Sequence, residues 1–131
     1  MEAIEEMNGM LKTLPKTDEL MNVLYVKRQK AVDAYYAMNA LILKQTKLYK
    51  ATYQTMFNSI KINGYNGMRF SSDQAIARQI EVDTSAQKET IDLLTNHNNY
   101  IKDTIQTIDN LIYSIKYKVT IHELINGIKT I

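Results

Sequence analysis

The chain has 131 residues, of which 45% are hydrophobic, and it carries a formal net charge of +2 with one proline and no cysteine. This length accommodates a single domain, and the absence of cysteine excludes disulfides, thiolate metal sites and a cysteine nucleophile. No apolar run approaches the ~18 residues that a membrane span requires, and the acidic start has the wrong sign for a signal peptide. We therefore expect no membrane contact and a cytoplasmic location.

Residues 1–14 carry apolar side chains at helical spacing, which predicts a short amphipathic helix that ends before Pro15. Thr17 and Asp18 are suitable N-caps for the next element. A long helix is predicted over residues 18–60, because an apolar stripe recurs there at helical intervals. The stripe consists of Leu24, Ala31, Tyr35, Met38, Ile42, Tyr49 and Met56. At ~1.5 Å per residue, this helix would be roughly 60 Å long.

A turn that reverses the chain is predicted over residues 61–71. The segment contains two Asn-Gly dipeptides, and both residue types accept a positive φ. The dipeptides are Asn63-Gly64 and Asn66-Gly67.

A second long helix is predicted over residues 72–118, because Ser71 and Gln74 have the spacing of a capping box at its start. The segment Asp83-Thr84-Ser85 could interrupt it. A short last helix is predicted over residues 120–127. Thr120 and Glu123 form another capping box at its start, and Gly127 suits its C-terminal end.

Side chains spaced alternately three and four residues apart form an apolar seam along the second long helix. The seam comprises Leu94, Asn98, Ile101, Ile105, Ile108, Ile112, Ile115 and Val119, with Asn98 as its polar member. Isoleucine at both seam positions disfavours a two-stranded coil and favours three or more helices. We therefore predict an all-α fold, a hairpin of two long antiparallel helices with short N- and C-terminal helices, that assembles as a homo-oligomer of three or more subunits. The alternative is an intramolecular bundle of the four segments.

The polar residues of the seam region suggest no catalytic chemistry. Asn98 has two interpretations: a seam amide often fixes register and subunit number, or it marks where the seam turns to solvent. His97 and His122 have no second histidine at metal-binding spacing, so we expect no metal and no cofactor. The sequence also has no Gly-rich phosphate loop and no nucleophile elbow. We expect a protein without enzymatic activity.

One side of the first long helix is cationic. Residues 21–62 contain seven basic residues and one acidic residue. At 100° per residue, Lys44, Lys47, Lys50 and Lys61 fall within about a 120° arc opposite the apolar stripe. These ammonium groups could neutralise phosphates of a single DNA strand, Tyr53 could stack a base, and Arg69 in the turn could join them. The alternative is an ordinary solvated lysine face. In a ring of subunits, symmetry would repeat each lysine and extend the positive track.

The C-terminal part of the chain resembles a known family. The segments Ile108-Asp109-Asn110, Tyr113-Ser114-Ile115-Lys116 and Asn126-Gly127 resemble the closing segment of the UvsY family of bacteriophage recombination mediators. Val82-Asp83-Thr84-Ser85 is similar to a segment before the last helices of that family. The total length, the acidic N-terminal helix and the long basic helix before a Gly-containing loop are similar as well. Within the basic segment of the family, Lys50-Ala51 matches.

The resemblance implies a non-catalytic accessory factor of DNA recombination and repair. Such a factor binds single-stranded DNA as a ring-like oligomer and helps a RecA-like recombinase to replace a single-strand-binding protein. It implies Lys50 as a DNA contact and, for a phage-encoded chain, the cytoplasm of a bacterial host as the location. The alternative is a helical-hairpin interaction protein without nucleic-acid binding, such as a secreted toxin partner, a small chaperone or a phage structural component.

Overall fold

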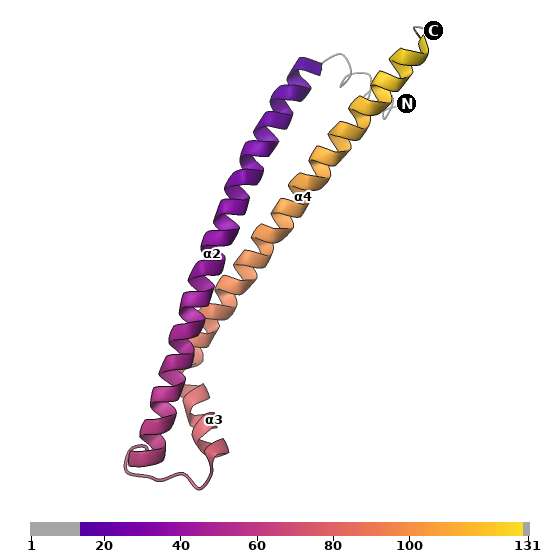
Figure 1. Ribbon diagram of the computed structural model, residues 1–131. Helices are drawn as coiled ribbons and strands as arrows, with labels where there is room; N and C mark the ends of the chain where they lie inside the picture. Colours follow the sequence, from indigo (N-terminus) through magenta and orange to yellow (C-terminus); the bar gives the residue numbers. More distant parts are fainter. Residues whose placement is uncertain (1–13, 130–131) are drawn as a thin grey trace. The chain divides into compact units, whose positions relative to one another are not determined.

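The computed structural model describes residues 14–129, which form three α-helices and no β-strand (Figure 1). Helix α2 spans Leu14–Asn63, α3 spans Asp73–Asp83 and α4 spans Ser85–Lys129. The predicted all-α character is confirmed for this part of the chain. The predicted helix over residues 1–14 lies outside the described residues, apart from Leu14.

Helix α2 begins four residues earlier than predicted. Since it starts at Leu14, Thr17 and Asp18 lie within its first turns and are not its N-caps. Pro15 occupies the second helical position, where its missing N–H leaves no intrahelical bond unmade and its fixed φ suits the helix. Pro15 therefore belongs to the start of α2, and the predicted end of a preceding helix before Pro15 lies outside the described residues. At the other end, α2 continues to Asn63.

The turn after α2 has the predicted backbone conformation. Gly64, Asn66 and Gly67 have φ values of 76°, 50° and 80°. Tyr65 and Met68 close the turn with two backbone hydrogen bonds of 2.8 and 3.0 Å. A Cβ at position 64 would lie 2.7 Å from the Met68 carbonyl oxygen, so glycine is required there by both its φ and its surroundings.

Helix α3 is capped one residue later than predicted. The Ser72 side chain accepts a hydrogen bond of 3.2 Å from the Ala75 N–H, so Ser72 is the N-cap and the pairing of Ser71 with Gln74 is not used. A serine at this position satisfies one of the free N–H groups of the first turn. The helix then places Ile76 and Ile80 on its buried side.

The second long helix is interrupted at Thr84, where the sequence allowed for a break. Thr84 is buried, its hydroxyl donates to the Ile80 carbonyl at 2.7 Å, and its N–H donates to the same oxygen at 2.8 Å. Its φ of −106° and ψ of 10° depart from helical values. The chain therefore forms α3 and α4 in place of one helix.

Helix α4 continues through the position where a new helix was predicted. The Thr120 hydroxyl donates to the Lys116 carbonyl at 3.0 Å, which is the bond of a threonine inside a helix and not of an N-cap. Gly127 also lies within α4 and does not end it. The separate helix over residues 120–127 was thus wrongly predicted, because a Thr-x-x-Glu pattern is equally compatible with a helix interior.

The described residues belong to two compact units, each with a small hydrophobic core. The terminal unit combines α2 up to Tyr35 with α4 from Tyr100 onward. In its core, Leu24 packs with Ile108, Ile112 and Ile115, and Met21 and Val119 cover this cluster.

The turn unit comprises residues 36–99 and contains the rest of α2, the turn, α3 and the first part of α4. Its core consists of Ile60, Ile76 and Ile80, of which Ile80 has no exposed surface. Five partly buried side chains pack against this cluster; they are Tyr53, Met56, Phe57, Tyr65 and Phe70. This packing fixes which side of α2 remains at the surface of the turn unit.

Candidate nucleic-acid interface

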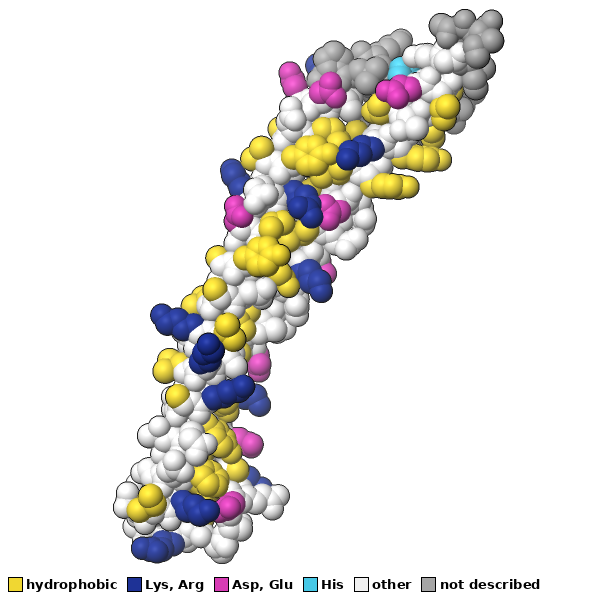
Figure 2. Space-filling model, viewed as in Figure 1, with side chains coloured by type: hydrophobic (Ala, Val, Ile, Leu, Met, Phe, Trp, Pro, Cys, Tyr) yellow, Lys and Arg dark blue, Asp and Glu magenta, His cyan; other side chains and the backbone are white. Residues whose placement is uncertain are grey.

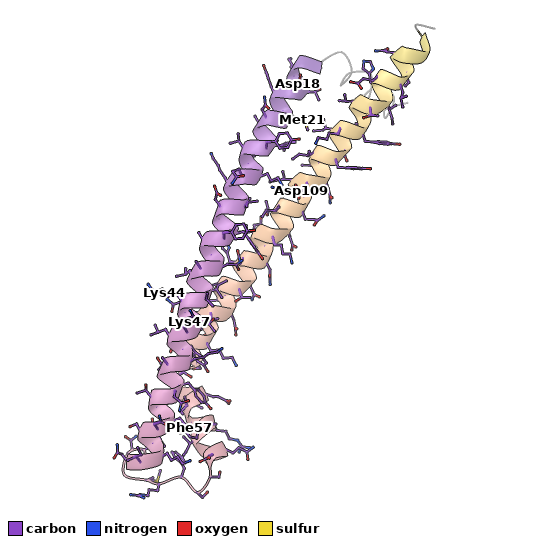
Figure 3. All side chains as sticks on the ribbon, viewed as in Figure 1. Asp18, Met21, Lys44, Lys47, Phe57 and Asp109 are labelled. Atoms are coloured by element: carbon purple, nitrogen blue, oxygen red, sulfur yellow. The ribbon has the colours of Figure 1, made fainter. Side chains whose placement is uncertain are left out.

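Three lysines lie on one exposed side of α2 in the turn unit. They are Lys44, Lys47 and Lys50, and Figure 3 labels the first two. Each is three residues from the next, so neighbours differ by ~60° around the helix and ~4.5 Å along it. None of them forms an ion pair with any residue between 14 and 129. Three ammonium groups in a short row can therefore contact an anion from solution.

The cationic side of α2 has no acidic neighbours along the helix. The chain has no aspartate or glutamate between Asp33 and Asp73, and this interval holds Lys44, Lys47, Lys50, Lys61 and Arg69. In Figure 2, dark-blue basic side chains stand at the surface among yellow hydrophobic ones. The part of α2 after Asp33 therefore carries basic side chains and no carboxylate, so its own charges are all positive.

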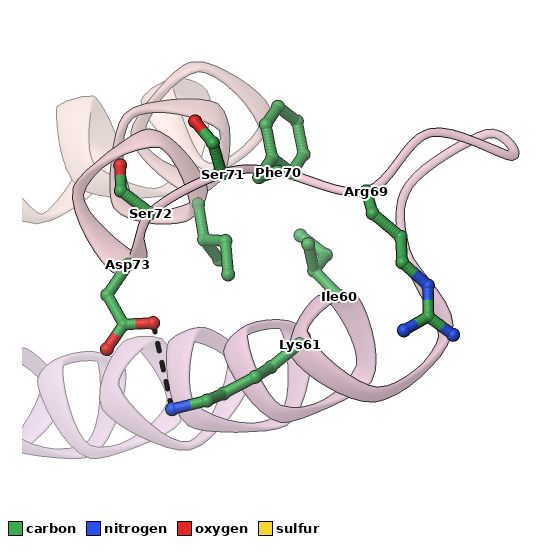
Figure 4. Close-up of a pocket in the computed structure, with 8 residues that line it drawn as sticks. Ile60, Lys61, Arg69, Phe70, Ser71, Ser72 and Asp73 are labelled. Carbon is green, nitrogen blue, oxygen red and sulfur yellow. Dashed lines mark ion pairs between the residues drawn. The ribbon is translucent and has the colours of Figure 1, made fainter.

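Lys61 and Arg69 lie together beside the turn, at a pocket that also includes Phe70, Ser71 and Ser72 (Figure 4). The ammonium group of Lys61 is 3.6 Å from the Asp73 carboxylate and 5.8 Å from the centre of the Phe57 ring. Arg69 is exposed. Lys61 is thus partly neutralised by Asp73, whereas the three lysines further along α2 are not.

Tyr53 occupies a different environment from the lysines. Its ring is half-buried against the core of the turn unit. The centroid of the Tyr53 ring lies 6.4 Å from the centroids of the Tyr49 and Phe57 rings, and its plane is nearly parallel to that of Phe57. Tyr53 therefore contributes to the packing of α2.

An exposed aromatic residue that the sequence analysis did not single out shares the lysine side. Tyr36 is 66% exposed and lies three turns before Lys47. Eleven residues of helix correspond to a rotation of only ~20°, so Tyr36 and Lys47 lie on the same side of α2. The sequence does contain the indication for Tyr36, because the projection at 100° per residue that groups the lysines places Tyr36 with them.

The isoleucine seam contacts the same chain. Ile108, Ile112 and Ile115 are buried against Leu24 of α2, so this part of the seam packs within the chain. Four further seam residues are partly buried; they are Leu94, Ile101, Ile105 and Val119. Contact of the seam with a second copy remains a prediction.

Asn98 is buried in the seam, with 4% of its surface exposed, so the interpretation that the seam turns to solvent there is wrong. Its Nδ2 donates to Asn39 Oδ1 of α2 at 2.7 Å. Its Oδ1 has no hydrogen-bond partner among the described residues. A buried amide pairs in only a few arrangements, so this pair restricts the register of α2 and α4 within the turn unit.

The described residues contain no group of three or more His, Cys, Asp or Glu side chains arranged to hold a metal ion. His97 is exposed, and the His122 ring lies 3.2 Å from the Asn126 amide. Among the helices of residues 14–129, none has the length and hydrophobicity needed to cross a bilayer.

Comparison of the chain with protein-family models, with curated proteins and with solved structures finds no match.

Proposed function

We propose that this chain is a non-catalytic protein that binds single-stranded DNA as a homo-oligomer. The observation that carries the proposal is the row of exposed, unpaired lysines at positions 44, 47 and 50, in a segment free of acidic residues. Lysine ammonium groups bind phosphates by charge and require no particular base sequence.

A single strand suits this surface better than a duplex. The lysines form a row along α2, and a flexible single strand can place successive phosphates along such a positively charged row. Tyr36 offers a ring on the same side, and base stacking on an aromatic ring is tolerant of sequence. In this assignment, Lys61 and Arg69 extend the contact toward the turn, and Tyr53 has a packing role.

Binding to a fluorescently labelled oligothymidylate, measured by anisotropy at several salt concentrations, tests the proposal. We expect the variant K44Q/K47Q/K50Q to bind more weakly and to have a salt slope smaller by about 2, since each single-strand phosphate contact contributes about 0.7. The matched control is R78Q/K88Q/K102Q, which removes the same charge from exposed positions on α3 and α4.

Equal loss of binding in the two variants would show that net charge, and not the α2 surface, governs binding. Absence of binding by the parent protein at low salt would overturn the proposal altogether.

The resemblance to recombination mediators extends this proposal to partners. In this role the protein acts in the cytoplasm of the host and helps a RecA-like recombinase to assemble on strands covered by single-strand-binding protein. This role can be measured as nucleotide hydrolysis by the recombinase on single-stranded DNA that is covered by single-strand-binding protein. We expect the hydrolysis to be faster when the covered DNA is first incubated with this protein. K44Q/K47Q/K50Q is expected to lose that acceleration.

Exposed hydrophobic residues on α4 favour a second candidate function, which is binding to another protein without nucleic acid. Tyr113, Tyr117 and Leu124 are 71%, 58% and 62% exposed, and their spacing of four and seven residues places them on one side of α4. This candidate predicts that the parent protein does not bind DNA. It also predicts that Y113A/Y117A/L124A no longer binds the protein partner.

A further inference from the structure

A second surface of α2, in the terminal unit, combines exposed valines with an ordered set of charges. Val23 and Val26 are 48% and 55% exposed. They line a shallow groove together with Asn22, Lys27 and Lys30. Val26 is rotated by ~200° from the buried Leu24, so this surface lies away from the core of the unit. Nothing among the described residues covers it.

The residues of this surface follow the alternating spacing of a helix-pairing stripe. Glu19, Val23, Val26, Lys30 and Asp33 are separated by four, three, four and three residues, and Lys16 precedes them at the same spacing. The four charged residues are exposed. None of them forms an ion pair with another described residue, and Asp33 accepts one hydrogen bond, from Gln29 at 2.9 Å.

The order of the charges fits a second copy of this chain in the antiparallel direction. In such a pair, with a two-fold axis between Val23 and Val26, Val23 lies opposite Val26 of the second copy. Glu19 then lies opposite Lys30 of the second copy, and Lys16 lies opposite Asp33 of the second copy. Each of these contacts occurs twice by symmetry, as in any interface that pairs a surface with itself.

A parallel pair would have the opposite electrostatics. Glu19 would face Glu19 of the second copy and Lys30 would face Lys30, so every charged position would meet its own sign. Like charges at close range are unfavourable, and such patterns set the orientation of helix pairs. The two central valines alone do not distinguish the directions, whereas the charges do.

We propose that the surface formed by Lys16, Glu19, Val23, Val26, Lys30 and Asp33 is a homodimer interface, in which two α2 helices pack antiparallel through their terminal units. This interface is separate from the isoleucine seam, which packs within the chain. It does not depend on DNA binding, so it can be tested without nucleic acid.

Reversing the charges at positions 19 and 30, singly and together, tests the interface. We expect E19K and K30E each to raise the dimer dissociation constant by at least about tenfold in sedimentation equilibrium, because each replaces two attractive pairs with two repulsive ones. The double variant E19K/K30E restores opposite charges at both pairs, and we expect it to dimerise nearly as well as the parent. Circular dichroism verifies that the three variants are equally helical.

Disulfide formation tests the direction of the helices, since the parent chain has no cysteine. We expect a mixture of E19C and K30C to form a crosslinked dimer on oxidation. E19C alone is expected not to crosslink, because the two copies of residue 19 lie ~16 Å apart along the axis of the antiparallel pair. S114C, at an exposed position on α4, is the control for random collision.

Three results would overturn the proposal. They are a parent protein that stays monomeric throughout the micromolar range, a double variant no better than E19K alone, and crosslinking of E19C with itself as efficient as crosslinking of the mixture.

Discussion

Arg28 donates a hydrogen bond from Nε to Asp109 Oδ1 at 2.6 Å, although the two residues are 81 positions apart. The contact joins α2 and α4 within the terminal unit, and the hydrogen bond and the charge of Asp109 raise the pKa of Arg28. Both side chains keep about two fifths of their surface exposed, at 40% and 43%, so solvent screens the pair.

From this pair we expect R28A and D109A each to lower the thermal midpoint slightly. The charge-swapped variant R28D/D109R should recover part of the loss, because the attraction is restored with altered geometry. Melting followed by circular dichroism, with K102A as a control for charge removal elsewhere on α4, measures the effect. A swapped variant that melts below both single variants would show that geometry, not charge, matters at this contact.

Ile80 provides the strongest test of the core of the turn unit. It has no exposed surface, whereas Val82 on the same helix is 68% exposed. We expect I80A to lower the free energy of unfolding by roughly 2–5 kcal/mol through lost burial and the cavity that remains. V82A should change it by less than about 0.5 kcal/mol. Urea titrations at one protein concentration compare the two, and similar values would contradict the packing described for α3.

At Asn98 we expect a substitution to stabilise the protein, in contrast to Ile80. Its buried Oδ1 lacks a partner among the described residues, and its partner Asn39 is exposed enough to bind water. We expect N98L to raise the free energy of unfolding by about 1 kcal/mol, because an unsatisfied acceptor is removed. Light scattering on the same variant should show a broader distribution of masses if the amide fixes register. A destabilised N98L would mean that the amide is fully satisfied in the folded protein.

Gly64 and Gly67 differ in surroundings though not in backbone conformation. Both have a positive φ, but a Cβ would clash with the Met68 carbonyl only at position 64. We expect G67A to cost about 1–2 kcal/mol from the left-handed conformation, and G64A to cost more. Chemical denaturation distinguishes them, and equal losses would show that the turn relaxes around the added methyl group.

Tyr65 confers a pH dependence on the turn unit. Its hydroxyl lies 3.5 Å from the Asp83 carboxylate, and the hydrogen bond and the negative charge raise its pKa above the ordinary 10.0. Since the folded pKa exceeds the unfolded one, the stabilisation is present below about pH 10 and is lost as the pH rises through the folded value. We expect stability above about pH 10 to fall more steeply for the parent than for Y65F. D83N should lower the Tyr65 pKa in an NMR titration of its ring.

Local chemistry explains the parts of the fold that the sequence predicted correctly. The Asn-Gly dipeptides identify the turn, because few residues accept a positive φ. Thr84 lies in the segment where a break was allowed for, but its hydroxyl bond to the Ile80 carbonyl does not explain the break, because Thr120 makes the same bond inside α4. Helix ends were less predictable. Ser71 and Ser72 are both good caps, and the choice between them depends on how Phe70 and Ile76 pack, which is not a local property.

Contacts between distant segments could not be predicted from spacing. The seam periodicity identifies which residues are buried, but it does not identify what covers them. Leu24 of the same chain covers Ile108 and Ile112. Burial of these residues against a second copy would require the same periodicity, so the sequence pattern does not distinguish the two arrangements. For the candidate interface, the lysine arc followed from helical projection, whereas the burial of Tyr53 and the exposure of Tyr36 required the packing of the turn unit.

The stretch between Asp33 and Asp73 lacks histidine as well as carboxylates. Every charged side chain in this stretch is therefore a lysine or an arginine. On the proposal that this surface binds single-stranded DNA, ionic strength is the variable by which a cell could tune the contact, because dissolved salt weakens the attraction between lysines and phosphates.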